Sequence, residues 1–165
     1  MAEKIVPDAA GAMAAEDLEQ LVKRAERGDE SALPELRLLL DRDPALWRHA
    51  GDMGRIAEDS LVALAAGPNL LLKEALGRRL AELKAELAGA DPSPVVRLLA
   101  ERVAICWLGA TYGDASYAQA KGSPAPAVEH ARRRQDSAGR RYAEALKLMA
   151  NVRRLLGGGR GKKDL

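Results

Sequence analysis

The stretch PVVRLLAERVAICWLGATYGDASYAQ, residues 94–119, constrains the fold more than any other part of the chain. Ser93 followed by Pro94 predicts a helix start, because a serine oxygen can accept from free N–H groups and proline suits the first helical position. Apolar residues behind this start occupy more than one helical face: Val95, Leu98, Leu99, Val103, Ile105, Cys106, Trp107 and Leu108. A helix that is apolar on most sides must be covered on most sides. We therefore predict a central helix with other helices packed around it.

The residue usage predicts an all-α protein. Leu, Ala, Arg, Glu and Lys, which are strong helix formers, dominate the chain, and it contains no Phe. A chain of 165 residues is long enough for one domain with its own core. We predict a single-domain bundle of about six helices over residues 14–156, between a loose tail (1–13) and a flexible basic tail (157–165).

Periodic leucines and turn residues give the order of the helices. Four mixed-charge helices are predicted before the central one, at about 16–27, from Asp29 or Ser31 onward, at 44–66, and at 69–88. Gly51 and Gly54 predict a break or bend in the third of these, or close approach of a neighbouring helix. The short linker KGSPAPA makes the last helix, 126–156, an antiparallel neighbour of the central helix.

Charge is distributed unevenly along the chain. Residues 1–120 carry 14 basic and 20 acidic side chains, whereas residues 121–165 carry 12 and 4, so the formal charge changes from −6 to +8. Such asymmetry suggests a basic module for an anionic partner, or two surfaces that attract each other.

The basic cluster is the strongest functional signal. Consecutive arginines on the last helix span too wide a face to be buried, and arginine forks match phosphate oxygens. We predict sequence-independent contacts to DNA or RNA phosphates by Arg132, Arg133, Arg134, Arg140, Arg141, Arg153, Arg154, Lys162 and Lys163. Two other interpretations remain open. The arginines could form a solvated face with ion pairs such as Glu129–Arg133 and Asp136–Arg140, or they could contact acidic helices or an acidic protein.

A second functional class uses the apolar side of the same helix. Residues spaced by three and four form a seam whose first half is small or polar and whose second half is apolar. The alternative function is a protein-interaction or oligomerisation module, with a second copy or a partner helix contacting Tyr142, Leu146, Met149, Val152 and Leu156.

Catalytic and metal signatures are weak. His49 and His130 have no second His or Cys one turn away, so no metal-ligand pair forms locally, and Cys106 lies in the most apolar segment, which is typical of core packing. The segment GGGRGKK lacks the Ser or Thr and the following helix of a phosphate-binding loop. We expect no enzyme activity, no metal and no cofactor. Tyr112 and Tyr117 are interpreted as packing residues, with a stacking platform for single-stranded nucleic acid as the alternative.

The remaining signals concern location and resemblance. A signal peptide is not expected, no apolar run approaches the ~18 residues of a membrane helix, and the lone cysteine suits a reducing compartment, so we expect a cytoplasmic protein without a membrane partner. The segments NLLLKEALGRRLAELKAEL, PSPVVRLLAERVAICWL and RRRQDSAGRRYAEALKLMANVRRLL resemble uncharacterised bacterial helical proteins associated with phage-like and other mobile-element settings. The resemblance implies a non-enzymatic accessory role and assigns no site residues.

Overall fold

A computed structural model of the chain describes residues 15–158, and within this range the protein consists of helices without strands. The all-α prediction is confirmed. The contacts divide the chain into two compact units, residues 1–52 and 53–165, where the sequence predicted one domain over 14–156. Each unit is described separately. The predicted tail at 1–13 and most of the tail predicted at 157–165 lie outside the described residues, whereas Gly157 and Gly158 belong to the last helix.

The first unit contains α1 (Ala15–Glu26), the 3-10 helix η1 (Glu30–Ala32), α2 (Leu33–Arg42) and α3 (Pro44–Ala50). Its turns form where the sequence places glycine and capping carboxylates. Gly28 has a φ of 79°, and Asp29 accepts a hydrogen bond from the Ser31 N–H at 3.0 Å. The Arg24 Nε donates to the Asp29 carboxylate at 3.0 Å, which links α1 to the start of η1. Hydrogen bonds from Ser31 and then Arg24 lower the pKa of Asp29.

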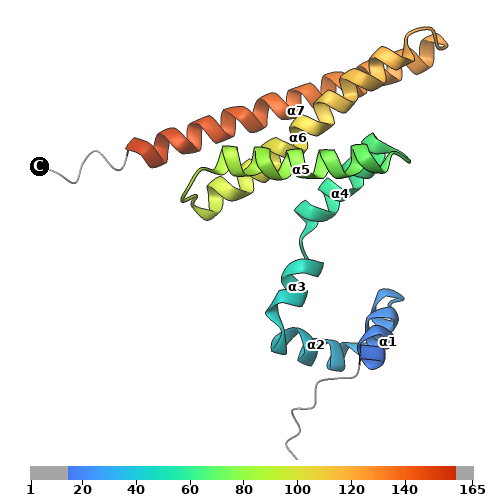
Figure 1. Cartoon of the computed structure of the whole chain (residues 1–165), viewed down its shortest axis with the longest axis vertical. Helices are drawn as coiled ribbons and strands as arrows, with labels where there is room; N and C mark the ends of the chain where they lie inside the picture. The colour runs from blue at the N-terminus through green and yellow to red at the C-terminus, as the bar shows by residue number, and fades with distance from the viewer. Residues whose placement is uncertain (1–14, 159–165) are drawn as a thin grey trace, which may run out of the picture. The chain divides into compact units, whose positions relative to one another are not determined.

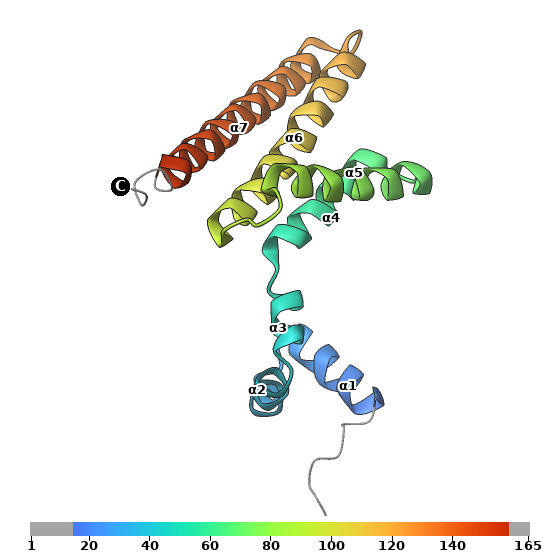
Figure 2. The same cartoon turned by 60° about the vertical axis from the view of Figure 1, so that its left-hand side comes forward.

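The second unit contains α4 (Met53–Ala66), α5 (Leu70–Ala88), α6 (Pro94–Ala120) and α7 (Ala125–Gly158). The helix predicted over 44–66 is therefore two helices, because two glycines within four residues weaken it at Gly51 and Gly54. Ser93 caps α6 as predicted, accepting from the Val96 N–H at 3.4 Å. Figures 1 and 2 both show α7 running back alongside α6, which confirms the predicted antiparallel pair.

The helix α6 is apolar on two sides because it serves two cores. One core joins α6 to α7, with Val103 and Met149 among its buried residues and Leu87 of α5 packed against it. The other joins α6 to α4 and α5, and Leu80 is fully buried in it. Burying such a side chain contributes about 1.5–3 kcal/mol.

The predicted arrangement around α6 needs two corrections. The helices that pack on α6 in its unit are α4, α5 and α7, because α1, α2 and α3 belong to the first unit. The first turns of α6 also carry exposed apolar residues, and Leu98 is 65% exposed. The first turns of α6 are thus covered on the side of Val96 and exposed on the side of Leu98.

Candidate functional site

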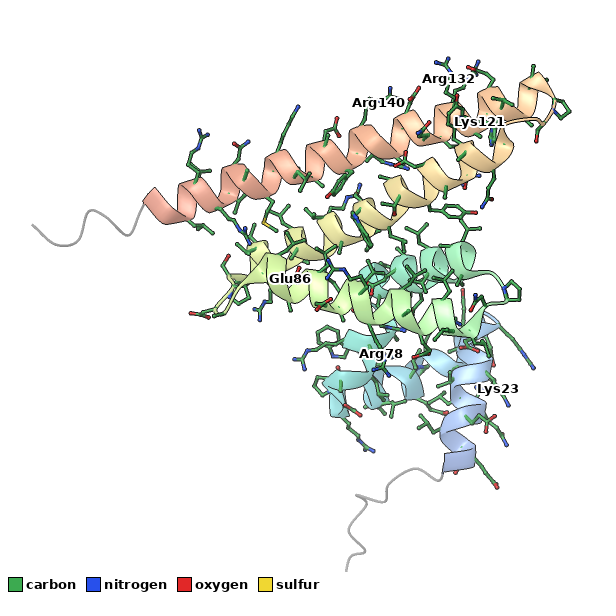
Figure 3. All side chains as sticks on the ribbon, turned by 45° about the horizontal axis from the view of Figure 1, so that its top comes forward. Lys23, Arg78, Glu86, Lys121, Arg132 and Arg140 are labelled. Atoms are coloured by element: carbon green, nitrogen blue, oxygen red, sulfur yellow. The ribbon has the colours of Figure 1, made fainter. Side chains whose placement is uncertain are left out.

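The rotation of α7 divides the predicted arginines between two faces. Ala138, Ala145 and Met149 are buried and fix which side of α7 packs inward. At 100° per residue, Arg134 and Arg141 lie on the flank of this buried side, whereas Arg132, Arg133 and Arg140 lie on the outer side. Figure 3 shows Arg132 and Arg140 on the side of α7 that faces away from α6.

Ion pairs engage two of the outer arginines. The Arg132 Nε donates to one oxygen of Glu129 at 3.0 Å, and the Arg133 Nε donates to the other at 2.8 Å. These hydrogen bonds, that of Arg132 first, lower the pKa of Glu129 to about 2. The interpretation of this face as a surface laced with ion pairs therefore describes Arg132 and Arg133 well.

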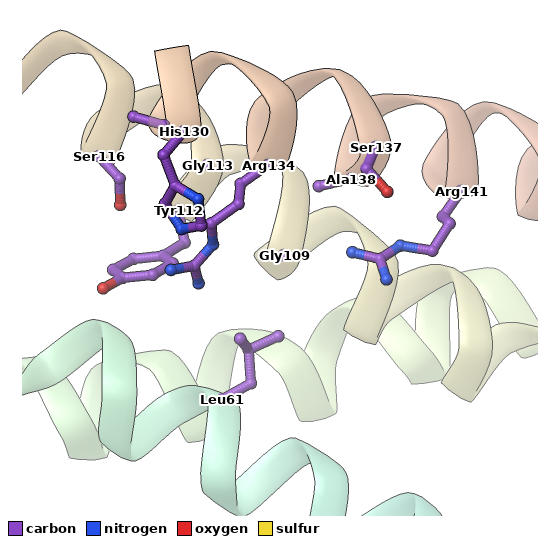
Figure 4. Close-up of a pocket in the computed structure, with 11 residues that line it drawn as sticks. Leu61, Gly109, Tyr112, Gly113, Ser116, His130, Arg134, Ser137, Ala138 and Arg141 are labelled. Carbon is purple, nitrogen blue, oxygen red and sulfur yellow. The ribbon is translucent and has the colours of Figure 1, made fainter. Parts of the chain in front are cut away.

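A cavity of about 400 Å³ lies between α6 and α7 beside Leu61 of α4. Three side chains on one flank of α7, spaced by four and seven residues, line it: His130, Arg134 and Arg141. The α6 helix contributes Gly109, Tyr112, Gly113 and Ser116. Figure 4 shows Tyr112, Arg134 and Arg141 pointing into the space above Leu61. The cavity thus combines an aromatic ring, hydroxyl groups and two guanidinium groups.

Two glycines of α6, Gly109 and Gly113, line this cavity. A Cβ atom at Gly113 would lie 3.3 Å from the Gln135 Cα, so the two helix backbones approach closely there. One turn earlier, a Cβ at Gly109 would lie 3.7 Å from the Leu61 Cδ2, which is ordinary contact. Side chains longer than that of alanine at Gly109 would therefore extend towards Leu61 and the cavity.

The electrostatic character of the cavity is basic. No Asp or Glu is among the described residues that line it. The side chains of Arg134 and Arg141 make no hydrogen bond or ion pair with any residue from 15 to 158. The nearby carboxylate of Asp114 accepts a hydrogen bond at 2.8 Å from the Gln135 Nε2. The donors of both guanidinium groups are therefore available to an anionic group.

A smaller cavity of about 190 Å³ adjoins the first and shares Leu61, Gly109, Ala138 and Arg141 with it. Arg102 of α6 also lines the smaller cavity, as does the buried Cys106. The described residues around it again include no carboxylate. Arginine side chains therefore line both adjoining cavities between α6 and α7.

The other residues predicted to contact phosphate have different surroundings. Arg153 donates a hydrogen bond to the Leu87 carbonyl oxygen, which connects α7 to α5, and Arg154 reaches Asn151 Oδ1 at 3.5 Å. Arg140 is exposed on the outer face. Lys162 and Lys163 lie outside the described residues.

The seam predicted for a partner mostly packs within the unit itself. Met149 is buried in the core between α6 and α7, and Tyr142 and Val152 pack against that core. Leu146 and Leu156 remain exposed. The apolar surface available to a partner is therefore smaller than the whole seam.

The aromatic and metal candidates separate in the structure. Tyr112 lines the cavity, whereas the Tyr117 ring lies 5.8 Å from the Lys121 Nζ, so the two rings do not form one platform in the cavity. His130 lines the cavity and His49 lies on α3. Among residues 15–158, no group of three or more His, Cys, Asp or Glu side chains could hold a metal ion.

The sequence reasoning missed the cavity, although two signals for it are present. Gly109 and Gly113 form a Gly-x-x-x-Gly spacing, which permits close helix approach. His130, Arg134 and Arg141 form a stripe on one flank of α7, which becomes visible once the arginines are sorted by helical angle rather than counted as one cluster.

Comparison of the chain with protein-family models, with curated proteins and with solved structures finds no match. In the part of the chain that the structure describes, no helix combines the length and apolar character needed to cross a membrane. The resemblance to bacterial mobile-element proteins stays a prediction, and the geometry of the cavity carries the functional argument.

Proposed function

We propose that this protein is a non-enzymatic helical accessory protein that binds nucleic-acid phosphates, largely independently of sequence, through the basic flank of α7. The observation that carries the proposal is the pair Arg134 and Arg141, which line a cavity without carboxylates and have no partner among the described residues. Arginine forks bind phosphate oxygens in pairs of hydrogen bonds, and such contacts position a backbone without reading bases.

The spacing of the two arginines on this flank suits a nucleic-acid strand. Arg134 and Arg141 lie seven residues apart. Seven residues are about two helical turns, or roughly 10 Å along the axis. Two guanidinium groups at that spacing can contact separate phosphates along one strand. We place the protein in the cytoplasm of a bacterial cell, in keeping with its single cysteine.

The test is binding to fluorescent DNA and RNA, single-stranded and double-stranded, across a salt series. Arg134→Ala/Arg141→Ala is compared with Arg132→Ala/Arg133→Ala, which removes the same charge from arginines already paired with Glu129. We expect the first variant to lose about tenfold or more in affinity, about 1.4 kcal/mol. Its salt slope on a single strand should be shallower by about 0.7 for each lost phosphate contact.

Two results would count against the proposal. Absence of binding by the unaltered protein even at low salt would exclude a nucleic-acid function. Equal losses of affinity in the two double variants would show that binding depends on the total positive charge of α7 and not on the arginines that line the cavity.

A second candidate function, a protein-interaction module, is favoured by apolar residues of α7 that stay exposed. Leu148 and Leu155, seven residues apart, share the flank of Arg134 and Arg141, and Leu155 is 73% exposed. Sedimentation over a range of protein concentrations tests this function. Self-association that is lost in Leu148→Glu/Leu155→Glu would support it, and a monomer at all concentrations would exclude a second copy as the partner.

A further inference from the structure

The cavity between α6 and α7 offers more than phosphate contacts. Tyr112 presents an aromatic ring, Leu61 an apolar side chain, and Ser116 and Ser137 present hydroxyl groups that both donate and accept hydrogen bonds. The guanidinium groups of the α7 flank supply positive charge beside them. A phosphate alone could accept hydrogen bonds from the guanidinium and hydroxyl groups, but it would make no use of the aromatic ring or of Leu61. The ring and Leu61 match an aromatic group that is joined to a phosphate.

The position of the tyrosine distinguishes this site from a plain basic surface. Tyr112 is half-buried, so its ring is held by its surroundings while part of it remains accessible. Gly109, three residues away, leaves open the space beside the ring, whereas Gly113 lets α7 approach closely. Base–aromatic stacking is largely independent of base identity, because every base has a π-face.

We propose that this cavity takes one unstacked nucleotide of a single-stranded nucleic acid, with its base against Tyr112 and the adjoining phosphates on Arg134 and Arg141. The inference rests on the proposed function and adds the class of substrate. Bases in a duplex are paired and stacked, so one of them could enter only after being flipped out, whereas a single strand offers its bases directly. The protein therefore prefers single strands.

The closing experiment compares four probes by fluorescence anisotropy and competition. The probes are an oligothymidylate, a strand of the same length that lacks bases, a duplex of that length, and free thymidine 5′-monophosphate. We expect the oligothymidylate to bind at least about tenfold more tightly than the other three. The abasic strand keeps every phosphate, so its weaker binding measures the contribution of the bases.

Two variants test the role of the cavity, and one variant serves as a control. Tyr112→Leu removes the ring, and we expect about a fivefold or greater loss on oligothymidylate with little change on the abasic strand. Gly109→Leu fills the space while keeping every charge and Tyr112, and we expect a similar loss. Tyr117→Leu removes a half-buried tyrosine of the same helix that does not line the cavity, and its binding should match that of the unaltered protein. Circular dichroism and thermal melting check that each variant is folded.

The possible failures can be told apart. If no probe binds, the proposed phosphate-binding function fails together with the inference. If oligothymidylate, abasic strand and duplex bind equally and Tyr112→Leu has no effect, phosphate binding stands and the nucleotide site is wrong. If the free nucleotide binds as tightly as the strand, the site belongs to a small molecule and the single-strand inference is overturned.

Discussion

Gly113 on α6 lies directly beneath Gln135 on α7, at a separation that leaves no room for another side chain. A Cβ atom added to Gly113 would be 3.3 Å from the Gln135 Cα, a backbone atom that cannot turn aside. Nearby, the Gln135 side chain donates to Asp114 at 2.8 Å and links the same two helices. The backbones of α6 and α7 therefore approach closely next to the cavity, and this contact fixes how α7 presents Arg134.

Alanine substitutions at the two glycines of α6 should have opposite effects on stability. Gly113→Ala should destabilise the protein by about 1–3 kcal/mol, because the extra methyl group pushes α7 away. Gly109→Ala meets only Leu61 at an ordinary 3.7 Å and replaces a poor helix former, so it should stabilise by about 0.5–1 kcal/mol. Urea denaturation measures both changes, and equal effects of the two substitutions would contradict the close approach at Gly113.

The ion pair between Lys84 of α5 and Glu58 of α4 should contribute more than exposed pairs do. The Lys84 Nζ lies 2.8 Å from Glu58, and the side chains are only 30% and 14% exposed. Removing one partner leaves a partly buried charge, so we expect Glu58→Gln to cost about 1–2 kcal/mol, between the values for exposed and buried pairs.

The control for that prediction is Glu82→Gln, because Glu82 pairs with Arg79 three residues away on the exposed side of α5. Such surface pairs contribute about 0–1 kcal/mol. Denaturation of Glu58→Gln and Glu82→Gln compares the two losses of stability. Denaturation of Lys84→Met and of Glu58→Gln/Lys84→Met completes a double-mutant cycle, which gives the coupling free energy between Glu58 and Lys84. A coupling free energy near zero would show that their contact does not stabilise the unit.

Most of the helices could be predicted from local signals in the sequence. The cavity could not, because it forms only where residues of different helices come together. The pair Ser93–Pro94 predicted the start of α6. The two glycines after Ala50 predicted a break, a bend or a close helix contact, and the structure has a break between α3 and α4. In the primary sequence, Gly109 and Gly113 look only like weak points of a helix. Their role becomes visible when α7 packs on them and Leu61 of α4 closes the other side.

The division of the arginines could have been predicted in part. The seam through Ala138 and Met149 was visible in the sequence, and helical angles place Arg134 and Arg141 beside it. Of the two one-turn pairs predicted from the sequence, Glu129–Arg133 is present, whereas Asp136 and Arg140 form no ion pair among residues 15–158. The α6 side of the cavity could not be predicted, because no local pattern says which part of α6 faces a given turn of α7.

Glu129 should stay ionised far into the acid range. Its folded-state pKa of about 2 lies below the ordinary 4.5, so the ion pairs stabilise the folded protein fully above pH 4.5. That contribution is lost as the pH falls from about 4.5 to about 2. A carbon-detected NMR titration should find the Glu129 midpoint well below that of an unpaired glutamate. In Arg132→Ala/Arg133→Ala the midpoint should return towards 4.5, and an unchanged midpoint would contradict the assigned cause.

Neutralising Glu129 should strengthen nucleic-acid binding. Its carboxylate holds the guanidinium groups of Arg132 and Arg133, and Glu129→Gln frees both for phosphate contacts. Exposed ion pairs of this kind are weak, so we expect a gain of no more than about fivefold in affinity. Glu144→Gln is the matched control, since it removes the same charge from an exposed α7 residue that forms no ion pair among residues 15–158. Fluorescence anisotropy at moderate salt compares the affinities of the two variants for nucleic acid. A larger gain in affinity for Glu129→Gln than for Glu144→Gln would support the idea that Glu129 holds the two arginines back from phosphate. Equal gains would mean that only the net charge of α7 had changed.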